Sequence, residues 1–198
     1  MQSHPGRAAS TPGSPAYPGT PRILSFSRGE YRGAESFISP HTILADLTAE
    51  IAAAGGSRAA APMSVTLDVP RALQIEADGE IIRRMLAPLL YRSVAATASR
   101  STVGPSSREV LVTAVGYPDR IEIEFADSGP GLTLWERNSL PRGISTAAPR
   151  ESTDPLLDDV LRLAVSIGGT LSAIECPEGG SAVTLSLPIH RAALRRAA

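Results

Sequence analysis

The sequence predicts an α/β (α+β) two-layer sandwich, in which three helices cover one face of a mixed sheet of about five strands. Apolar residues recur at helical spacing in three segments, and they alternate with polar residues in several shorter ones. Glycine or proline separates most of these segments. Their order is helix, strands, helix, hairpin, loop, helix, hairpin, which favours helices packed against one sheet.

The first half of the predicted domain contains two helices and two extended segments. The first helix has its apolar residues at Ile43, Leu44, Leu47 and Ile51. Gly55 and Gly56 are expected to end it, because glycine disfavours a continuing helix. Asp78 is a good N-cap for the second helix. Three elements are predicted after the first helix: a strand at Ser64–Val69, an extended segment at Leu73–Ala77 and the second helix at Gly79–Ala98.

The second half alternates between hairpins, a glycine loop and a third helix. Gly116-Tyr117-Pro118-Asp119 is typical of a turn that joins two strands. Thr133–Asp154 has no clear periodicity, and we expect it to be irregular. The other predicted elements are strands at Glu109–Val115 and Arg120–Phe125, a glycine loop at Asp127–Leu132, a helix at Leu156–Ile167, and closing strands at Thr170–Glu175 and Ala182–Leu187.

The chain divides into four parts by composition. Residues 1–21 hold five prolines among glycine and serine, and such a segment buries too little apolar surface to fold. We therefore expect a disordered Pro/Gly-rich tail there, a transitional segment at 22–36, a folded domain at 37–188 and a basic C-terminal tail at 189–198.

The composition and net charge of the chain exclude several classes of chemistry and of binding partner. All 19 basic residues are arginine, which excludes a lysine-based mechanism, and the net charge of −1 gives no general attraction to nucleic acid or to an anionic membrane. The single cysteine, Cys176, excludes an internal disulfide and a cysteine-rich metal site. The sequence has no apolar run of about 18 residues and no signal-peptide pattern, so we expect a cytoplasmic protein.

One loop carries more information than the rest. Ala126–Leu132 reads ADSGPGL at the end of a predicted strand. An aspartate there can accept a hydrogen bond from an exocyclic amine such as that of adenine, and Gly129 and Gly131 allow positive φ and close approach to a flat ligand. A simple Asp-Ser-Gly turn leaving a strand is the alternative interpretation.

Together with the order of elements, this loop resembles the catalytic ATP-binding domain (HATPase_c) of bacterial sensor histidine kinases, in the GHKL superfamily. The segments Gly168-Gly169-Thr170-Leu171 and Gly179-Gly180-Ser181, with Leu185–Pro188, are similar to the family's closing strands. Leu24–Glu30, LSFSRGE, resembles the end of its second dimerisation helix, so 22–36 is interpreted as a remnant of that helix. The resemblance implies a Bergerat-type ATP-binding fold in which Asp127 binds the adenine amine.

Three departures from the family pattern affect that site, two at its magnesium and phosphate end and one beside the adenine-binding Asp. The magnesium-holding Asn is replaced by Arg92, and the only Asn of the chain, Asn138, lies after the glycine loop. Asp154 and Leu156 stand where the family has phosphate-binding glycines. Ala182 stands where the family often has a Thr that supports the adenine-binding Asp. The resemblance therefore implies a vestigial ATP site of Asp127, Gly129, Gly131 and Arg92, in which ATP binding is weak or lost and magnesium is not expected. Direct pairing of Arg92 with phosphate is the counter-interpretation.

The family's phosphorylated histidine has no counterpart. The three histidines are His4, His41 and His190, and none is followed by the family's acid-proline pattern on a dimerisation helix. We therefore expect no self-phosphorylation and assign no catalytic residue.

Three functions remain open. The first is a pseudokinase of two-component-type signalling that binds a protein partner, such as a response regulator, a kinase or a sigma-factor regulator. The second is an active ATP-binding kinase that acts in trans on a separate protein, as anti-sigma-factor kinases do. The third is a remnant with little selected function. An adenine site filled by Met85, Leu89 or the Thr133–Asp154 segment favours the first, and an open cleft with Asp127 exposed on its floor favours the second.

Overall fold

The computed structural model describes residues 36–54, 63–99, 108–140, 155–177 and 179–189. All of them belong to one compact unit, Gly33–Ala198. Several of the sequence-based interpretations fall outside the described residues. They concern residues 1–21 with His4, residues 22–35, residues 141–154 with Asp154, and the tail from His190 onward.

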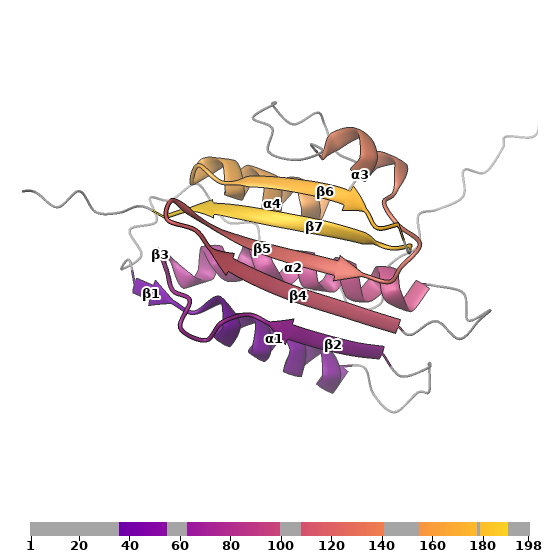
Figure 1. Ribbon diagram of the computed structural model, residues 1–198, viewed down its shortest axis with the longest axis horizontal. Helices are drawn as coiled ribbons and strands as arrows, with labels where there is room; N and C mark the ends of the chain where they lie inside the picture. Colours follow the sequence, from indigo (N-terminus) through magenta and orange to yellow (C-terminus); the bar gives the residue numbers. More distant parts are fainter. Residues whose placement is uncertain (1–35, 55–62, 100–107, 141–154, 178, 190–198) are drawn as a thin grey trace, which may run out of the picture. The chain divides into compact units, whose positions relative to one another are not determined.

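A five-stranded mixed sheet forms one layer of this unit (Figure 1). Its strand order is β2-β4-β5-β7-β6, and only the β2–β4 pair is parallel. A separate two-stranded sheet pairs β1 with β3. The strands are β1 (Ser36–Ile38), β2 (Met63–Asp68), β3 (Ile75–Ala77), β4 (Arg108–Gly116), β5 (Arg120–Asp127), β6 (Thr170–Glu175) and β7 (Ser181–Pro188).

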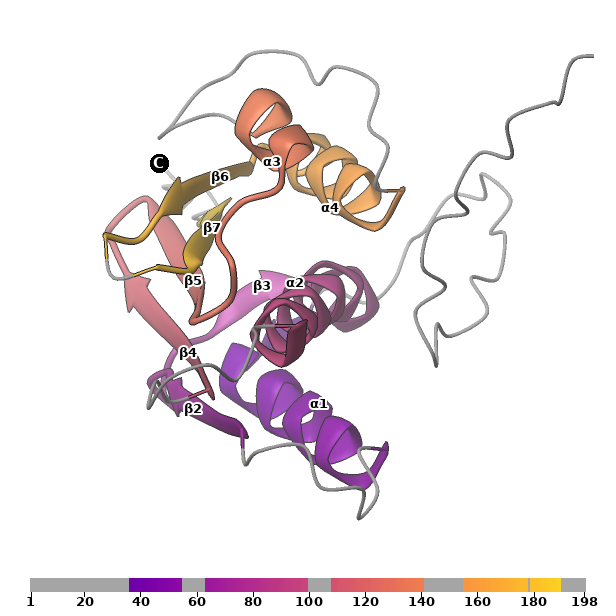
Figure 2. The same cartoon turned by 90° about the vertical axis from the view of Figure 1, so that its right-hand side faces the viewer.

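Three helices form the second layer and cover one face of the sheet, as Figure 2 shows end-on. These are α1 (Pro40–Ala54), α2 (Gly79–Ser99) and α4 (Pro155–Ser166). The central helix, α2, contacts both neighbouring helices as well as β4 and β5. A fourth, short helix, α3 (Leu134–Ser139), lies beside α4 in both ribbon views. The two-layer α/β sandwich that the sequence predicts is confirmed.

The core lies between α2 and the inward face of the sheet. Strand β5 alternates buried and half-buried residues, which turns Ile121, Ile123 and Phe125 toward the helices. The helix meets them with a stripe of fully buried residues, Ile82, Met85, Leu86, Leu89 and Leu90. Burial of each such side chain stabilises the fold by about 1.5–3 kcal/mol. This packing fixes the position of α2, and therefore of its residues that face the end of β5.

The N-terminus of α2 shows the expected cap. The Asp78 carboxylate accepts a hydrogen bond from the Glu80 N–H at 2.8 Å. The helix then continues through Pro88 to Ser99. No helix among the described residues is both long and apolar enough to cross a membrane.

Two elements differ from the sequence-based expectation. Strand β1 is too short to show periodicity, and it exists through its pairing with β3, where Phe37 lies opposite Glu76. Helix α3 occupies part of the segment that we expected to be irregular. Its signal is Thr133 followed three residues later by Glu136, which is the sequence pattern of a capping box.

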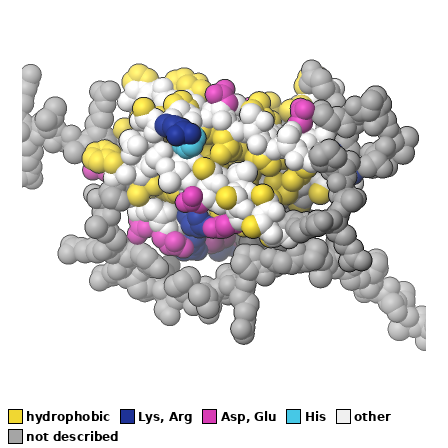
Figure 3. Space-filling model, turned by 90° about the horizontal axis from the view of Figure 1, so that it is seen from below, with side chains coloured by type: hydrophobic (Ala, Val, Ile, Leu, Met, Phe, Trp, Pro, Cys, Tyr) yellow, Lys and Arg dark blue, Asp and Glu magenta, His cyan; other side chains and the backbone are white. Residues whose placement is uncertain are grey.

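The surface of the unit carries charges of both signs. On the face seen in Figure 3, acidic and basic side chains of the described residues lie close to one another, with hydrophobic side chains between them. Arg83 on α2 and Glu50 on α1 form an ion pair, 2.6 Å apart, with side chains 34% and 52% exposed. Exposed pairs of this kind contribute about 0–1 kcal/mol to stability.

Candidate functional site

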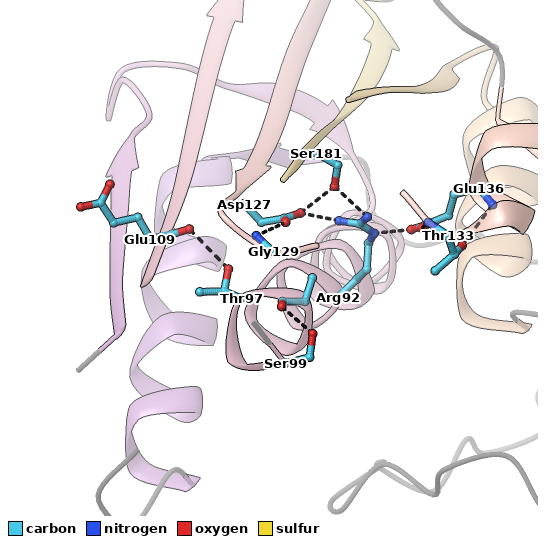
Figure 4. A network of polar contacts seen from close by, with 10 residues as sticks. Arg92, Thr97, Ser99, Glu109, Asp127, Gly129, Thr133, Glu136 and Ser181 are labelled. Carbon is cyan, nitrogen blue, oxygen red and sulfur yellow. Dashed lines mark hydrogen bonds and ion pairs between the residues drawn. The ribbon is translucent and has the colours of Figure 1, made fainter. Parts of the chain in front are cut away.

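Asp127 is the last residue of β5 and lies inside the protein. Its side chain is 0% exposed. Oδ1 accepts a hydrogen bond from the Gly129 N–H at 2.9 Å. Oδ2 accepts one from Arg92 Nη1 at 2.6 Å and another from the Ser181 hydroxyl at 2.8 Å. Both carboxylate oxygens are therefore satisfied by the protein itself (Figure 4).

Arg92 lies at the centre of this cluster. It projects from α2 and spreads its guanidinium over three partners: Nη1 donates to Asp127, Nη2 donates to the Ser181 hydroxyl at 2.8 Å, and Nε donates to Glu136. The side chain is 12% exposed. Burial lowers the pKa of the Arg92 guanidinium, but Glu136 and Asp127 raise it by more, so its pKa lies above the ordinary value and the group stays charged.

Glu136 forms the other side of the cluster, on α3. Oε1 accepts from Arg92, while Oε2 accepts from the Thr133 N–H at 2.6 Å. The Thr133 hydroxyl in turn accepts from the Glu136 N–H at 3.2 Å, which completes the capping box. Burial raises the pKa of the Glu136 carboxyl, but Arg92 and Thr133 lower it by more, so its pKa lies below the ordinary value. One glutamate thus caps α3 and binds Arg92.

The cluster contains one cation and two anions. The Arg92 guanidinium faces the Asp127 and Glu136 carboxylates, whose side chains are 0% and 5% exposed. Buried ion pairs require such hydrogen-bonded geometry, because removing charges from water is costly. The three side chains come from α2, β5 and α3. The cluster therefore connects the helix layer, the sheet and the short helix α3.

The glycines of the loop have different roles. Gly131 has φ +94°, as the sequence predicts. Gly129 is not among the residues with positive φ, so that part of the expectation is wrong. Gly129 is needed instead for close approach, since a Cβ there would lie 2.8 Å from the carbonyl carbon of Ala96. Of the four residues of the expected vestigial site, Arg92, Asp127 and Gly129 meet at the cluster. Gly131 lies near Gly180 and Glu175 instead.

Sequence reasoning missed two members of the cluster, Ser181 and Glu136. We expected residue 182, an alanine, at the place of the hydroxyl that supports Asp127. The β5–β7 register corrects this: Asp127 lies opposite Ser181, and Ala182 lies opposite Ala126. The supporting hydroxyl is therefore present, one residue earlier. Glu136 had a usable signal, its capping-box spacing from Thr133.

Solved structures of known proteins share this architecture. No protein-family model and no curated protein sequence matches the chain. The catalytic domain of histidine kinase ThkA superposes with a TM-score of 0.58 at 12% identity, covering 78% of this chain and 95% of that one. The mycobacterial sensor histidine kinase MprB gives a TM-score of 0.56 at 17% identity, over 77% and 97% of the two chains. Full-length ShkA in complex with AMPPNP gives 0.56 at 19% identity, over 78% of this chain and 31% of ShkA.

The chain has the fold of a histidine-kinase catalytic domain. At these identities the likeness establishes the architecture, and the residues of the site have to be judged individually. In this kinase-like fold Asp127 ends the strand that leads into the glycine loop. The position that the resemblance assigns to a magnesium-binding Asn holds Arg92, which contacts Asp127, Ser181 and Glu136.

The phosphate end of the kinase-like fold is only partly described. Helix α4 begins at Pro155, and its first turn includes Asp158, which pairs with Arg162 at 2.6 Å. Its neighbour Asp159 pairs with Arg84 of α2 at 3.0 Å. These acids therefore have partners within the fold. Among the described residues, no group of three or more histidine, cysteine, aspartate or glutamate side chains is arranged to hold a metal ion.

Proposed function

We propose that this chain is a cytoplasmic, histidine-kinase-like pseudokinase domain with weak or no ATP binding, which acts as a protein-binding module in two-component-type signalling. The observation that carries the proposal is the occupied state of Asp127, whose carboxylate is 0% exposed and hydrogen-bonded by Gly129, Arg92 and Ser181.

Adenine recognition requires an accessible acceptor. The resemblance to histidine kinases assigns the adenine amine to the carboxylate of Asp127. An amine that approaches this carboxylate must displace one of its partners, because the side chain is 0% exposed and both oxygens are already hydrogen-bonded. Displacement of Arg92 leaves a buried carboxylate without its cation, and a neutral amine does not replace the lost charge. The competition therefore favours the internal partner.

The residues present do not fit a magnesium–triphosphate group either. Magnesium binds oxygen ligands in a near-octahedral shell, and the guanidinium of Arg92 is a cation with no acceptor atom. The cluster of Arg92, Asp127 and Glu136 has a net charge of −1. It therefore repels a polyanion as a whole, although Arg92 alone attracts phosphate. Phosphoryl transfer depends heavily on metal-bound charge, so we propose no catalytic step here.

The proposed role follows from what the fold retains. The chain keeps the fold of a histidine-kinase catalytic domain, and the proteins that share the fold are named as histidine kinases, MprB as a sensor histidine kinase. A domain that keeps this architecture without its nucleotide chemistry retains surfaces for protein partners. The partner classes that we propose are a response regulator, a kinase or a sigma-factor regulator.

Isothermal titration calorimetry tests the nucleotide half of the proposal. ATP with magnesium is titrated into the wild-type protein, and the ShkA domain with AMPPNP serves as the positive control. We expect no heat of binding for this chain. A micromolar, magnesium-dependent affinity would refute the proposal and favour the alternative, a kinase acting in trans. Arg92→Asn and the matched Arg83→Asn on the same helix then show whether Arg92 is the specific block.

Pairwise binding assays test the partner half. Purified response regulators, kinases and sigma-factor regulators encoded beside this chain are titrated against it by biolayer interferometry. A saturable, micromolar or tighter interaction with one class supports the module and identifies its pathway. Failure of every adjacent candidate, together with absence of ATP binding, would favour a remnant with little selected function.

A further inference from the structure

Helix α3 is a small element with limited support of its own. It has six residues, and an isolated helix of that length is not stable in water. The capping box satisfies its first turn, and Leu140 at its end is 4% exposed. Leu132 and Leu140 on either side of the helix belong to the hydrophobic core, but no α3 side chain that the structure describes does. Its position therefore depends strongly on the side chains that connect it to the rest of the unit.

Two ion pairs among the described residues connect α3 to other elements. Arg137 pairs with Glu175 of β6 at 2.8 Å, and both side chains are 45% exposed. Such a pair is screened by water and contributes little. Glu136 pairs with Arg92 of α2, and these side chains are 5% and 12% exposed. Hydrogen bonds to buried charged groups are considerably stronger, so the Arg92–Glu136 pair is the main polar connection.

The same guanidinium binds Asp127. Figure 4 shows Arg92 between Asp127 on one side and Glu136 on the other. The position of α3 and the burial of Asp127 are therefore coupled through one side chain. Arg92 cannot leave Asp127 for a ligand without losing its place at Glu136, and release of Glu136 frees Arg92 to move.

We propose that the Arg92–Glu136 pair is a latch that holds α3 against the core without bound nucleotide, and that breaking it releases α3 locally while the sheet stays folded. The biological role of this pair rests on the proposed function. The pair deepens that proposal because it is the contact that controls access to Asp127. A partner or a modification that competes for Glu136 would open the same contact.

Hydrogen exchange followed by NMR, in the absence of nucleotide, tests the latch. The Arg137 and Leu140 amides report on α3, since they donate to the carbonyls of Thr133 and Glu136 at 3.0 Å. Glu136→Gln removes the carboxylate charge that faces Arg92, yet glutamine still supports a capping box. We expect both amides to exchange about tenfold faster or more, with the amides of β5 and β7 unchanged.

Two further variants make the result specific. Glu175→Gln breaks the exposed pair on the same helix and is expected to change α3 exchange by less than about twofold. Arg92→Lys keeps the positive charge but loses the three-way fork, and it should accelerate α3 exchange as Glu136→Gln does.

Three results would overturn the latch. They are an unprotected α3 in the wild type, unchanged α3 exchange in Glu136→Gln, and an equal rise across α3 and the sheet. Because no nucleotide is present, these results are independent of the calorimetric test. ATP binding by the wild type would refute the proposed function and leave the latch standing.

Discussion

Replacing Arg92 by methionine should strongly destabilise the domain. Methionine keeps much of the aliphatic length of arginine and removes its charge and its three hydrogen-bonded contacts. The carboxylates of Asp127 and Glu136 then remain at 0% and 5% exposure without their cation. Removing one partner of a buried ion pair costs about 3–5 kcal/mol, a large share of the roughly 5–15 kcal/mol that stabilises a typical domain.

Urea unfolding followed by far-ultraviolet circular dichroism measures this loss of unfolding free energy. In thermal unfolding of a domain of about 150 residues, the same 3–5 kcal/mol corresponds to a fall in Tm of roughly 6–20 °C. Arg83→Met is the matched control on the same helix, because its pair with Glu50 is 34% and 52% exposed and should contribute less than about 1 kcal/mol. If the two variants differ by less than about 1 kcal/mol, the cluster is not a buried ionic network and the reasoning is refuted.

The charge cluster, the turn and the helix cap lead to three more predictions. The pKa of Glu136 lies below its ordinary value of about 4.5, so its stabilising effect is complete above that pH and is lost as the pH falls through the lower, folded-state pKa. The difference in unfolding free energy between wild type and Glu136→Gln should therefore shrink below about pH 4.5 in urea titrations; a constant difference contradicts this. Gly180→Ala should destabilise by more than about 2 kcal/mol, because its Cβ would lie 1.8 Å from the Asp127 carbonyl oxygen, whereas Gly179→Ala, also at positive φ but in open space, should cost about 1–2 kcal/mol. Equal midpoints for these two would count against the close approach. Thr133→Ala should cost about 1 kcal/mol through loss of the α3 cap, and an unchanged urea midpoint would show that α3 does not need it.

The sequence was sufficient for the architecture because each large element has its own periodicity. The stripe on α2 and the alternation in β5 identify their inward faces without tertiary information. Asp78 marks the start of α2 by local chemistry, since its carboxylate accepts from the Glu80 N–H; Gly55, expected to end α1, lies outside the described residues. Strand β1 could not be predicted in this way, since its three residues are ordered by pairing with β3.

The candidate site was predictable only in part. The loop identified Asp127 and the resemblance identified Arg92, but neither showed that the two side chains pair with each other. Residues 92, 127 and 181 are far apart in the sequence, and neither they nor residue 136 share a motif. Ser181 became visible only through the β5–β7 register, because a shift of one residue in a strand moves a side chain to the opposite face.

The sequence by itself determined the fold, and the resemblance to histidine kinases predicts an adenine site at Asp127 and a magnesium ligand replaced by Arg92. Only the tertiary structure decided which groups Arg92 contacts. A guanidinium of unknown surroundings can bind phosphate as readily as carboxylate, and the choice depends on which acceptors lie within about 3 Å of it. Folding brings Asp127 and Glu136 to Arg92 from two other elements and buries all three. In this structure the arginine therefore binds the protein's own carboxylates.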